Sequence, residues 1–212
     1  MIATNNLQLL PGNKTLQSAC KAMAVLDAIL CQDWVYRYYS YNSQWSEGEE
    51  FFEMRNGEGD QLLVLFRNEG AVINGYFSEA EQGEKDKLTA RLPEVFHEFI
   101  FGEPVNSAGT TFCVWQLNNS PWTTGIPSEN DDHSEELLSP LDGEPASYVK
   151  WASDYFKGSY KEGGIPLETV VRIFAQEPLT KEMVLSIVDH LEDWDQLTED
   201  LIEISNPYHK NL

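Results

Sequence analysis

The residues with the most distinctive chemistry are aromatic, and they lie in one short stretch of the sequence. Six tyrosines and tryptophans fall within twelve positions, at Trp34, Tyr36, Tyr38, Tyr39, Tyr41 and Trp45. Tyr and Trp combine rigid apolar contact area with a polar tip, and they are enriched where proteins meet partners or ligands. The stretch predicts a partner-binding surface, unless its rings fill the two faces of a small sheet instead.

Acidic residues are the second feature, because 35 Asp and Glu oppose 14 Lys and Arg and give a net charge of −21. Such a chain repels nucleic-acid phosphates and anionic membrane surfaces, so binding to either is disfavoured. It attracts a basic protein instead. The part after residue 117 is the more acidic, with 19 acidic and 6 basic residues. We expect Glu192, Asp193 and Asp195 to belong to a surface that binds a basic partner.

The scarce basic residues suggest a different chemistry. Arg37, Arg55 and Arg67 fall on expected strands, where three guanidinium groups could hold an anionic ligand. One shared concave face would favour such a ligand site, whereas scattered arginines would favour the protein-binding interpretation. Asp27 joins this site or is structural, because it projects away from the polar stripe of an apolar helix. We expect its carboxylate to be buried and hydrogen-bonded to a tyrosine or to Arg37.

Familiar catalytic and metal-binding motifs fail at identifiable positions. His97 and Glu98 begin like a zinc-protease helix, but Phe101 occupies the position of the second histidine. Residues 56–60 alternate like the start of a calcium loop, yet Gln61 stands where that loop needs glycine, so we interpret them as a hairpin turn. The three cysteines have no metal-site spacing and are expected to be free core residues. The sequence thus nominates no catalytic residue, no metal ligand and no cofactor.

The elements that must position these residues follow from hydrophobic periodicity. Apolar residues around most of the helical circumference predict a helix over 15–31 that is buried on several sides. From 34 to 77 the period changes to two, with turn residues between four runs, which predicts an antiparallel meander. The unbroken apolar run 62–66 is expected to be its central strand. A helix over 86–101 should pack on the sheet, and 110–117 supplies a fifth strand.

The rest of the chain is expected to be mainly helical. A connecting loop, rich in Pro, Gly and acidic residues such as Glu129, is followed by helices, the last of which is capped by Thr180 and interrupted near Asp193. The predicted fold class is α+β: an N-terminal helix, a meander of about five strands with a packed helix, and an all-helical C-terminal segment. The corresponding divisions are a core domain over 1–117, an acidic loop over 118–143 and a helical extension over 144–212.

Several short motifs resemble a family of conserved, uncharacterised bacterial proteins. They are Tyr38-Tyr39-Ser40-Tyr41-Asn42-Ser43 with Trp45, Gly48-Glu49, Met54-Arg55-Asn56-Gly57 with Gly59-Asp60, Thr110-Thr111-Phe112-Cys113-Val114-Trp115, and the tail from Tyr155 to Pro207. This resemblance implies no catalytic residue. A weaker resemblance is to the SMI1/KNR4-like superfamily, α+β proteins of which many are immunity proteins or regulatory adaptors. That superfamily places Leu-Pro and an aromatic residue before its sheet, whereas Leu92-Pro93 and Phe96 here follow four expected strands.

Two main functional hypotheses result. The first is a non-enzymatic intracellular protein-binding protein, an immunity protein or adaptor that binds a basic partner through acidic and aromatic surface. The alternative is a small-molecule-binding protein or enzyme with an anionic-ligand pocket between the sheet and the C-terminal helices. A nucleic-acid mimic is a third, minor hypothesis, which requires paired rows of carboxylates. No apolar run approaches the roughly 20 residues of a membrane span, and a signal-peptide pattern is missing, so we expect a cytoplasmic protein.

Overall fold

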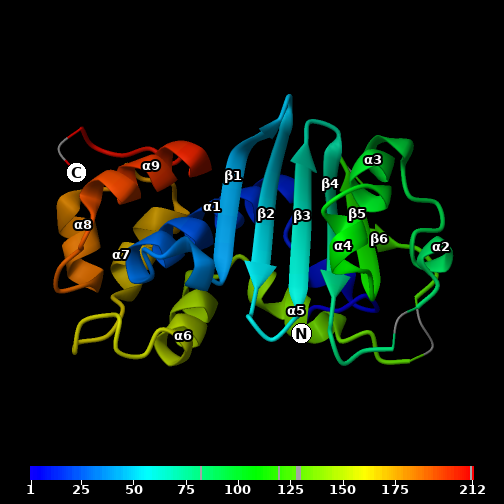
Figure 1. Cartoon of the computed structure of the whole chain (residues 1–212), viewed down its shortest axis with the longest axis horizontal. Helices are drawn as coiled ribbons and strands as arrows, with labels where there is room; N and C mark the ends of the chain where they lie inside the picture. Colours follow the sequence, from blue (N-terminus) through cyan, green and yellow to red (C-terminus); the bar gives the residue numbers. More distant parts are fainter. Residues whose placement is uncertain (82, 119, 128–129, 211) are drawn as a thin grey trace.

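The computed structural model describes residues 1–81, 83–118, 120–127, 130–210 and 212, and it has an α+β fold (Figure 1). Across these residues six strands form one antiparallel sheet, in which each strand pairs with its neighbours in sequence. They are β1 (Tyr39–Ser46), β2 (Glu49–Arg55), β3 (Gln61–Arg67), β4 (Gly70–Tyr76), β5 (Phe112–Leu117) and β6 (Thr123–Thr124). The predicted fold class and the meander are confirmed, and the short β6 adds a strand to the five expected.

The central strand is β3, as its unbroken apolar run predicts. All residues from Leu62 to Phe66 are buried, because β2 and β4 flank β3 and a hydrophobic cluster covers each of its faces. The connection between β2 and β3 is the expected hairpin turn. Within it, Asn56 Oδ1 accepts hydrogen bonds from the N–H groups of Glu58 and Asp60. Two glycines of this turn have positive φ angles, a conformation that glycine adopts without strain.

The long N-terminal helix α1 (Asn13–Leu30) lies behind the sheet (Figure 1). Every residue from Ala22 to Leu30 is buried, because α1 contacts β1 on one side and helices α7 and α9 on others. This environment explains why apolar residues surround the helix instead of forming a single stripe.

The other helices lie mainly at the two ends of the sheet (Figure 1). The α-helices are α2 (Lys85–Leu88), α3 (His97–Phe101), α4 (Val105–Ala108), α5 (Ser134–Leu138), α6 (Pro145–Tyr155), α7 (Leu167–Phe174), α8 (Lys181–Ile187) and α9 (Trp194–Ile204), and the 3-10 helices are η1 (Leu7–Leu9), η2 (Trp34–Tyr36), η3 (Glu94–Phe96) and η4 (Ser139–Leu141). Side chains of Thr180 and Asp193 cap α8 and α9, which confirms the predicted cap and interruption. Within the described chain, no helix has both the length and the apolar character needed to cross a membrane.

The expected single helix over 86–101 is wrong, because this segment is divided into α2, η3 and α3. Arg91 adopts a left-handed backbone conformation, and Pro93 follows shortly after it, where its ring prevents a continuous helix. The packing prediction nevertheless holds. Phe96 and Ile100 join a hydrophobic cluster with side chains of β2, β3, β4 and β5 on one face of the sheet.

Two other boundaries differ from the expectation. Residues 34–36 form the 3-10 helix η2 and not the start of the first strand, because Asp33 accepts a hydrogen bond from the N–H of Val35 and turns the backbone. The region 118–143 is not a simple loop, since it contains β6, α5 and η4, and Leu138 and Leu141 are buried in the core. Glu129 lies outside the described residues.

One hydrophobic cluster connects the sheet with α1 and the C-terminal helices. Its members include Leu26 of α1, Phe52 and Val64 of the sheet, Val170 of α7 and Leu201 of α9. The helices after residue 144 therefore share the main core with the residues before 118.

Candidate functional site

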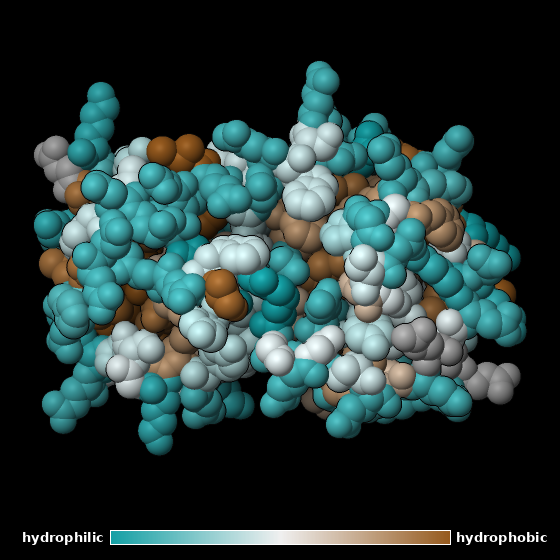
Figure 2. Space-filling model, viewed as in Figure 1, coloured by the Kyte–Doolittle hydropathy of each residue, from teal (hydrophilic) through white to brown (hydrophobic). Residues whose placement is uncertain are grey.

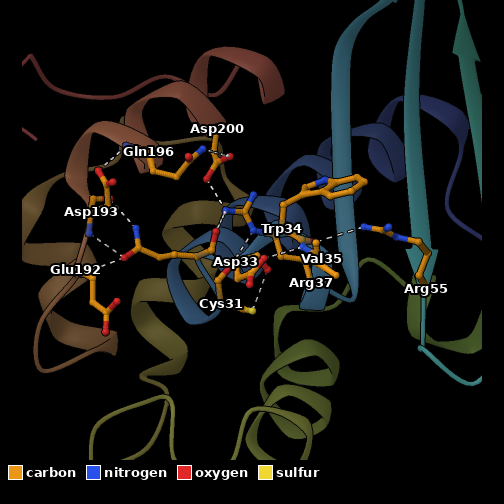
Figure 3. A network of polar contacts seen from close by, with 11 residues as sticks. Cys31, Asp33, Trp34, Val35, Arg37, Arg55, Glu192, Asp193, Gln196 and Asp200 are labelled. Carbon is orange, nitrogen blue, oxygen red and sulfur yellow. Dashed lines mark hydrogen bonds and ion pairs between the residues drawn. The ribbon is translucent and has the colours of Figure 1, made fainter.

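The predicted site residues Trp45 and Arg55 lie on β1 and β2, and Trp34 and Arg37 lie on the segment that precedes β1. The hydrophobic cluster that includes α3 takes its strand residues from β2 to β5, and within the described chain none comes from β1. Residues 31–37, which we call the connecting segment, run from α1 to β1 and lie between α9 and the sheet (Figure 3). The connecting segment thus places its side chains next to both elements.

Arg37 anchors the connecting segment. Its Nη2 lies 2.6 Å from Oδ2 of Asp200 in α9, and both side chains are buried. Its Nε donates to the carbonyl oxygen of Cys31 at 2.8 Å, and its Nη2 donates to that of Gln32 at 3.0 Å. These carbonyls follow the C-terminal end of α1, where the helix dipole stabilises a positive charge. Arg37 therefore holds α1, the connecting segment and α9 together, and its charge is matched by that of Asp200.

Gln32 joins the connecting segment to the start of α9. Its Oε1 accepts hydrogen bonds from the N–H groups of Glu192 (3.0 Å) and Asp193 (2.9 Å), and its Nε2 donates to the Asp193 carbonyl at 2.6 Å. Asp193 caps α9, because its Oδ1 accepts a hydrogen bond from the N–H of Gln196 at 2.9 Å. The backbone of Glu192 and Asp193 is thus fixed beside the connecting segment (Figure 3), while both residues are exposed.

Trp34 lies on the outer side of the connecting segment. The guanidinium carbon of Arg55 is 4.2 Å from the centre of the Trp34 ring, and an Arg55 nitrogen donates to the Trp34 carbonyl oxygen at 3.4 Å. Glu53 lies 3.5 Å from the same guanidinium. Trp34 is nevertheless 51% exposed, and Tyr36 is 70% exposed. The two aromatic side chains are therefore presented to solvent from a backbone that is held in place.

A small depression of about 120 Å³ is lined by Trp34 and Trp45. Trp45 is 41% exposed and stacks on Phe51 of β2, with 4.4 Å between the ring centres. Hydrophilic residues cover most of this side of the molecule, and paler, less polar residues gather in front of β1 and β2 (Figure 2). The depression therefore has aromatic walls within a largely polar surface.

The depression is also negatively charged. Its charged lining residues are Arg37, Glu53, Asp200 and Glu203. Burial is the main cause that raises the pKa of Glu53 and of Glu203, and the Asp200 charge adds to the effect on Glu203. An additional cation would favour the ionised form of both carboxylates. Arg37 is paired with Asp200 and Arg55 with Glu53, so among the described lining residues Glu203 is the carboxylate without an ion pair. The arrangement therefore suits a positively charged group better than an anion.

The aromatic stretch is divided between the surface and the core. Trp34, Tyr36 and Trp45 are exposed, whereas Tyr39 and Tyr41 are buried, so Tyr39 is removed from the predicted binding surface and Tyr41 contributes only to the wall of the depression. Tyr39 and Tyr41 belong to the cluster formed with α1, because alternate residues of β1 face that helix. Tyr38 is half-buried, and its ring packs edge to face with that of Tyr155. Asp195 is exposed in the first turn of α9.

The three arginines of the alternative ligand site do not converge. Arg37 is not on a strand, as was expected, but follows η2. Arg55 and Arg67 lie at opposite ends of the paired strands β2 and β3, and Arg67 contacts Glu49 at 2.8 Å. Each arginine thus has a carboxylate partner, and by the criterion of scattered arginines the anionic-ligand site is disfavoured.

Asp27 is fully buried and hydrogen-bonded, as predicted. Its Oδ1 accepts from the hydroxyl of Tyr148 at 2.7 Å, and its Oδ2 accepts from the N–H of Tyr39 at 2.8 Å. Burial raises the pKa of Asp27 to about 7, although both hydrogen bonds and the charge of Arg37 act in the opposite direction. The hydrogen-bonded tyrosine belongs to α6 and not to the segment after α1.

Sequence reasoning missed Gln32 and Asp200. Gln32 carries no distinctive signal, because its role depends on backbone groups that lie 160 positions away. Asp200 could have been found from helical spacing, since it is flanked on α9 by the buried residues Leu197, Leu201 and Ile204. This is the same pattern that identified Asp27.

The arrangement of possible metal ligands and the comparisons with known proteins assign no further role to these residues. Among the described residues, no three His, Cys, Asp or Glu side chains are grouped as a metal ion would require. No protein-family model, no curated protein and no solved structure matches the chain. The chemistry of the site is therefore inferred from its own residues.

Proposed function

We propose that this chain is a non-enzymatic protein-binding protein whose partner is basic. The binding surface, which we call the acidic aromatic surface, consists of Trp34, Tyr36, Trp45, Glu192, Asp193 and Asp195 with the depression between α9 and the sheet. The observation that carries the proposal is the combination of exposed tryptophans with a depression that is lined by three carboxylates and one arginine. Asp200 is paired with this arginine and Glu53 with Arg55, whereas Glu203 has no ion pair among the described residues. A Lys or Arg side chain of a partner matches this combination.

The size of the depression supports a protein partner. Pockets for small molecules usually enclose about 300–1,000 Å³, whereas this depression has about 120 Å³. That volume suits a single side chain at the centre of a larger contact area. Exposed tryptophans next to such a pocket are typical of residues that carry most of the free energy of a protein interface.

The anchoring of the connecting segment supports the same proposal. Gln32 and Arg37 fix its backbone through the hydrogen bonds described above, so little conformational entropy is lost when a partner binds. The net charge of −21 steers a cationic protein towards the molecule and raises its association rate. Immunity proteins and adaptors act through such binding, which agrees with the SMI1/KNR4-like resemblance.

The first test uses the two exposed tryptophans. A partner is captured on the immobilised protein from an extract of the source cells, and the purified partner is then titrated against the protein by biolayer interferometry. We expect the double substitution Trp34→Ala and Trp45→Ala to weaken binding at least about 30-fold, because one truncated hot spot costs about 2 kcal/mol or more. Phe101→Ala is the matched control, since Phe101 is a similarly exposed aromatic residue on α3. Equal binding by both variants would contradict the proposed surface.

The second test concerns charge. Glu192→Gln, Asp193→Asn and Asp195→Asn together should slow association, because electrostatic steering acts mainly on the on-rate. Asn at position 193 can still cap α9, so the helix is retained. Raising the salt concentration from about 50 to about 500 mM should slow association of the unchanged protein roughly tenfold.

A matched charge control distinguishes local recognition from total charge. Glu79→Gln, Glu94→Gln and Glu98→Gln remove the same three charges from exposed residues elsewhere in the structure. We expect a smaller effect on association from this triple variant than from the substitutions on α9. If the captured proteins are neutral or acidic and their binding does not depend on salt, the basic-partner proposal fails.

A further inference from the structure

A second cavity lies away from the acidic aromatic surface, between α6 and the α5–η4 region. Its volume is about 570 Å³, which is within the usual range for small-molecule sites. The buried residues Met23, Tyr39 and Tyr148 and the half-buried Trp151 form part of its wall. The cavity thus has the size and the mostly apolar lining that a small organic molecule requires.

Aromatic rings dominate the inner wall. The rings of Tyr39 and Trp151 are 4.9 Å apart with an interplanar angle of 58°, and those of Tyr148 and Trp151 are 5.6 Å apart at 57°. Inclined aromatic rings present electron-rich faces in more than one direction, and such faces attract cations, with Trp the most effective.

The hydroxyl of Tyr148, one of the polar groups of the wall, is turned towards the protein interior. The hydroxyl of Tyr148 donates its hydrogen to Asp27, which is buried behind the cavity, and the N–H of Tyr39 donates to the same carboxylate. These donors are therefore engaged and do not serve an anion in the cavity. The ring faces remain as groups that favour positive charge.

Acidic residues surround the opening. Glu135, Glu136 and Asp154 line the cavity together with one basic residue, Lys150. Glu136 is paired with His133 at 2.8 Å, whereas in the described part of the chain Glu135 and Asp154 form no ion pair. The local charge thus agrees with the preference of the aromatic wall.

We propose that this cavity is a binding site for a small organic ammonium ion. The ammonium group lies against the rings of Trp151 and Tyr148, and Glu135 and Asp154 attract it to the opening. This site is independent of the acidic aromatic surface, so either proposal can fail without the other.

The decisive experiment compares two ligands of equal shape and different charge. Choline and its neutral isostere 3,3-dimethylbutan-1-ol are titrated into the full chain by isothermal titration calorimetry, with benzyltrimethylammonium as a larger aromatic probe. We expect choline to bind about 5- to 30-fold more tightly than the neutral isostere, the range that a cation–aromatic contact supports. Equal affinity of the two isosteres, or no binding of the three probes at about 10 mM, would overturn the proposal.

Variants locate the binding. Glu135→Gln with Asp154→Asn alters exposed residues and should weaken benzyltrimethylammonium binding about 3- to 10-fold. The control Glu162→Gln with Glu168→Gln removes two exposed charges elsewhere and should leave it unchanged. Trp151→Leu should reduce affinity at least about tenfold, provided that its circular dichroism spectrum and melting match the unchanged protein. Binding that is insensitive to the Glu135 and Asp154 substitutions would show that the probe binds elsewhere and would also overturn the proposal.

Discussion

Arg37→Met is expected to lower the free energy of unfolding by about 3–5 kcal/mol, because it leaves the carboxylate of Asp200 buried without its partner. Two carbonyl oxygens, those of Cys31 and Gln32, also lose their donor. Chemical denaturation followed by circular dichroism at neutral pH measures this difference directly.

A double variant separates the lost ion pair from lost packing. With Asp200→Leu added, the unpaired charge is removed, and we expect much of the lost stability to return. Gln196, which donates to Asp200 at 3.3 Å, is half-buried and can reach solvent when the carboxylate is absent. If Arg37→Met alone costs less than about 1 kcal/mol, or if the double variant is no more stable, the buried pair does not have the proposed role.

Asp27→Asn is expected to remove a change of about 4 kcal/mol in the free energy of unfolding, which the unchanged protein undergoes between about pH 4 and pH 7. The pKa of Asp27 is raised to about 7 by burial, whereas an unfolded Asp has a pKa of about 3.9. Between these values the folded chain keeps a proton that the unfolded chain loses, so the contribution of Asp27 is fully present below about pH 4 and declines as pH rises to about 7. Each pKa unit corresponds to about 1.36 kcal/mol.

The asparagine variant should fold because it reproduces the neutral carboxyl group. Its amide oxygen can accept from the N–H of Tyr39, and its amide nitrogen can donate to the oxygen of Tyr148. We therefore expect Asp27→Asn to equal the unchanged protein near pH 4 and to exceed it in stability near pH 8. Asp27→Leu should be less stable at both pH values, since it leaves both donors without an acceptor. Parallel pH profiles for the unchanged protein and Asp27→Asn would contradict the prediction.

Local patterns predicted the elements that depend on neighbouring residues. The apolar circumference of α1 revealed that Asp27 is buried, and the spacing around Thr180 identified the cap of α8. Alternating side chains indicated β1, but the same alternation extends through Trp34 and Tyr36, which form a 3-10 helix. The alternation of residue types cannot show where the strand begins, because a short 3-10 helix can carry the same residue types although it has three residues per turn.

Distant pairings could not be predicted from the sequence. Tyr148 meets Asp27 across 121 positions, and Arg37 meets Asp200 across 163. Nothing in the local pattern around Tyr148 differs from that of a tyrosine that fills a core. The candidate surface was predicted by residue type and charge, while its boundaries depended on which aromatic residues of β1 face α1.

The antiparallel sheet pairs each strand with the next, so most of its hydrogen bonds can form while the later part of the chain is still being synthesised. Two ionisable side chains in the early part of the chain, Asp27 and Arg37, form hydrogen bonds with Tyr148 and Asp200, which are synthesised later. The connecting segment obtains its final position when α9 docks. A chain that stops before α9 would therefore have all six strands but would lack the α9 residues of the proposed surface, so the proposed partner recognition would require chains whose synthesis has reached the last helix.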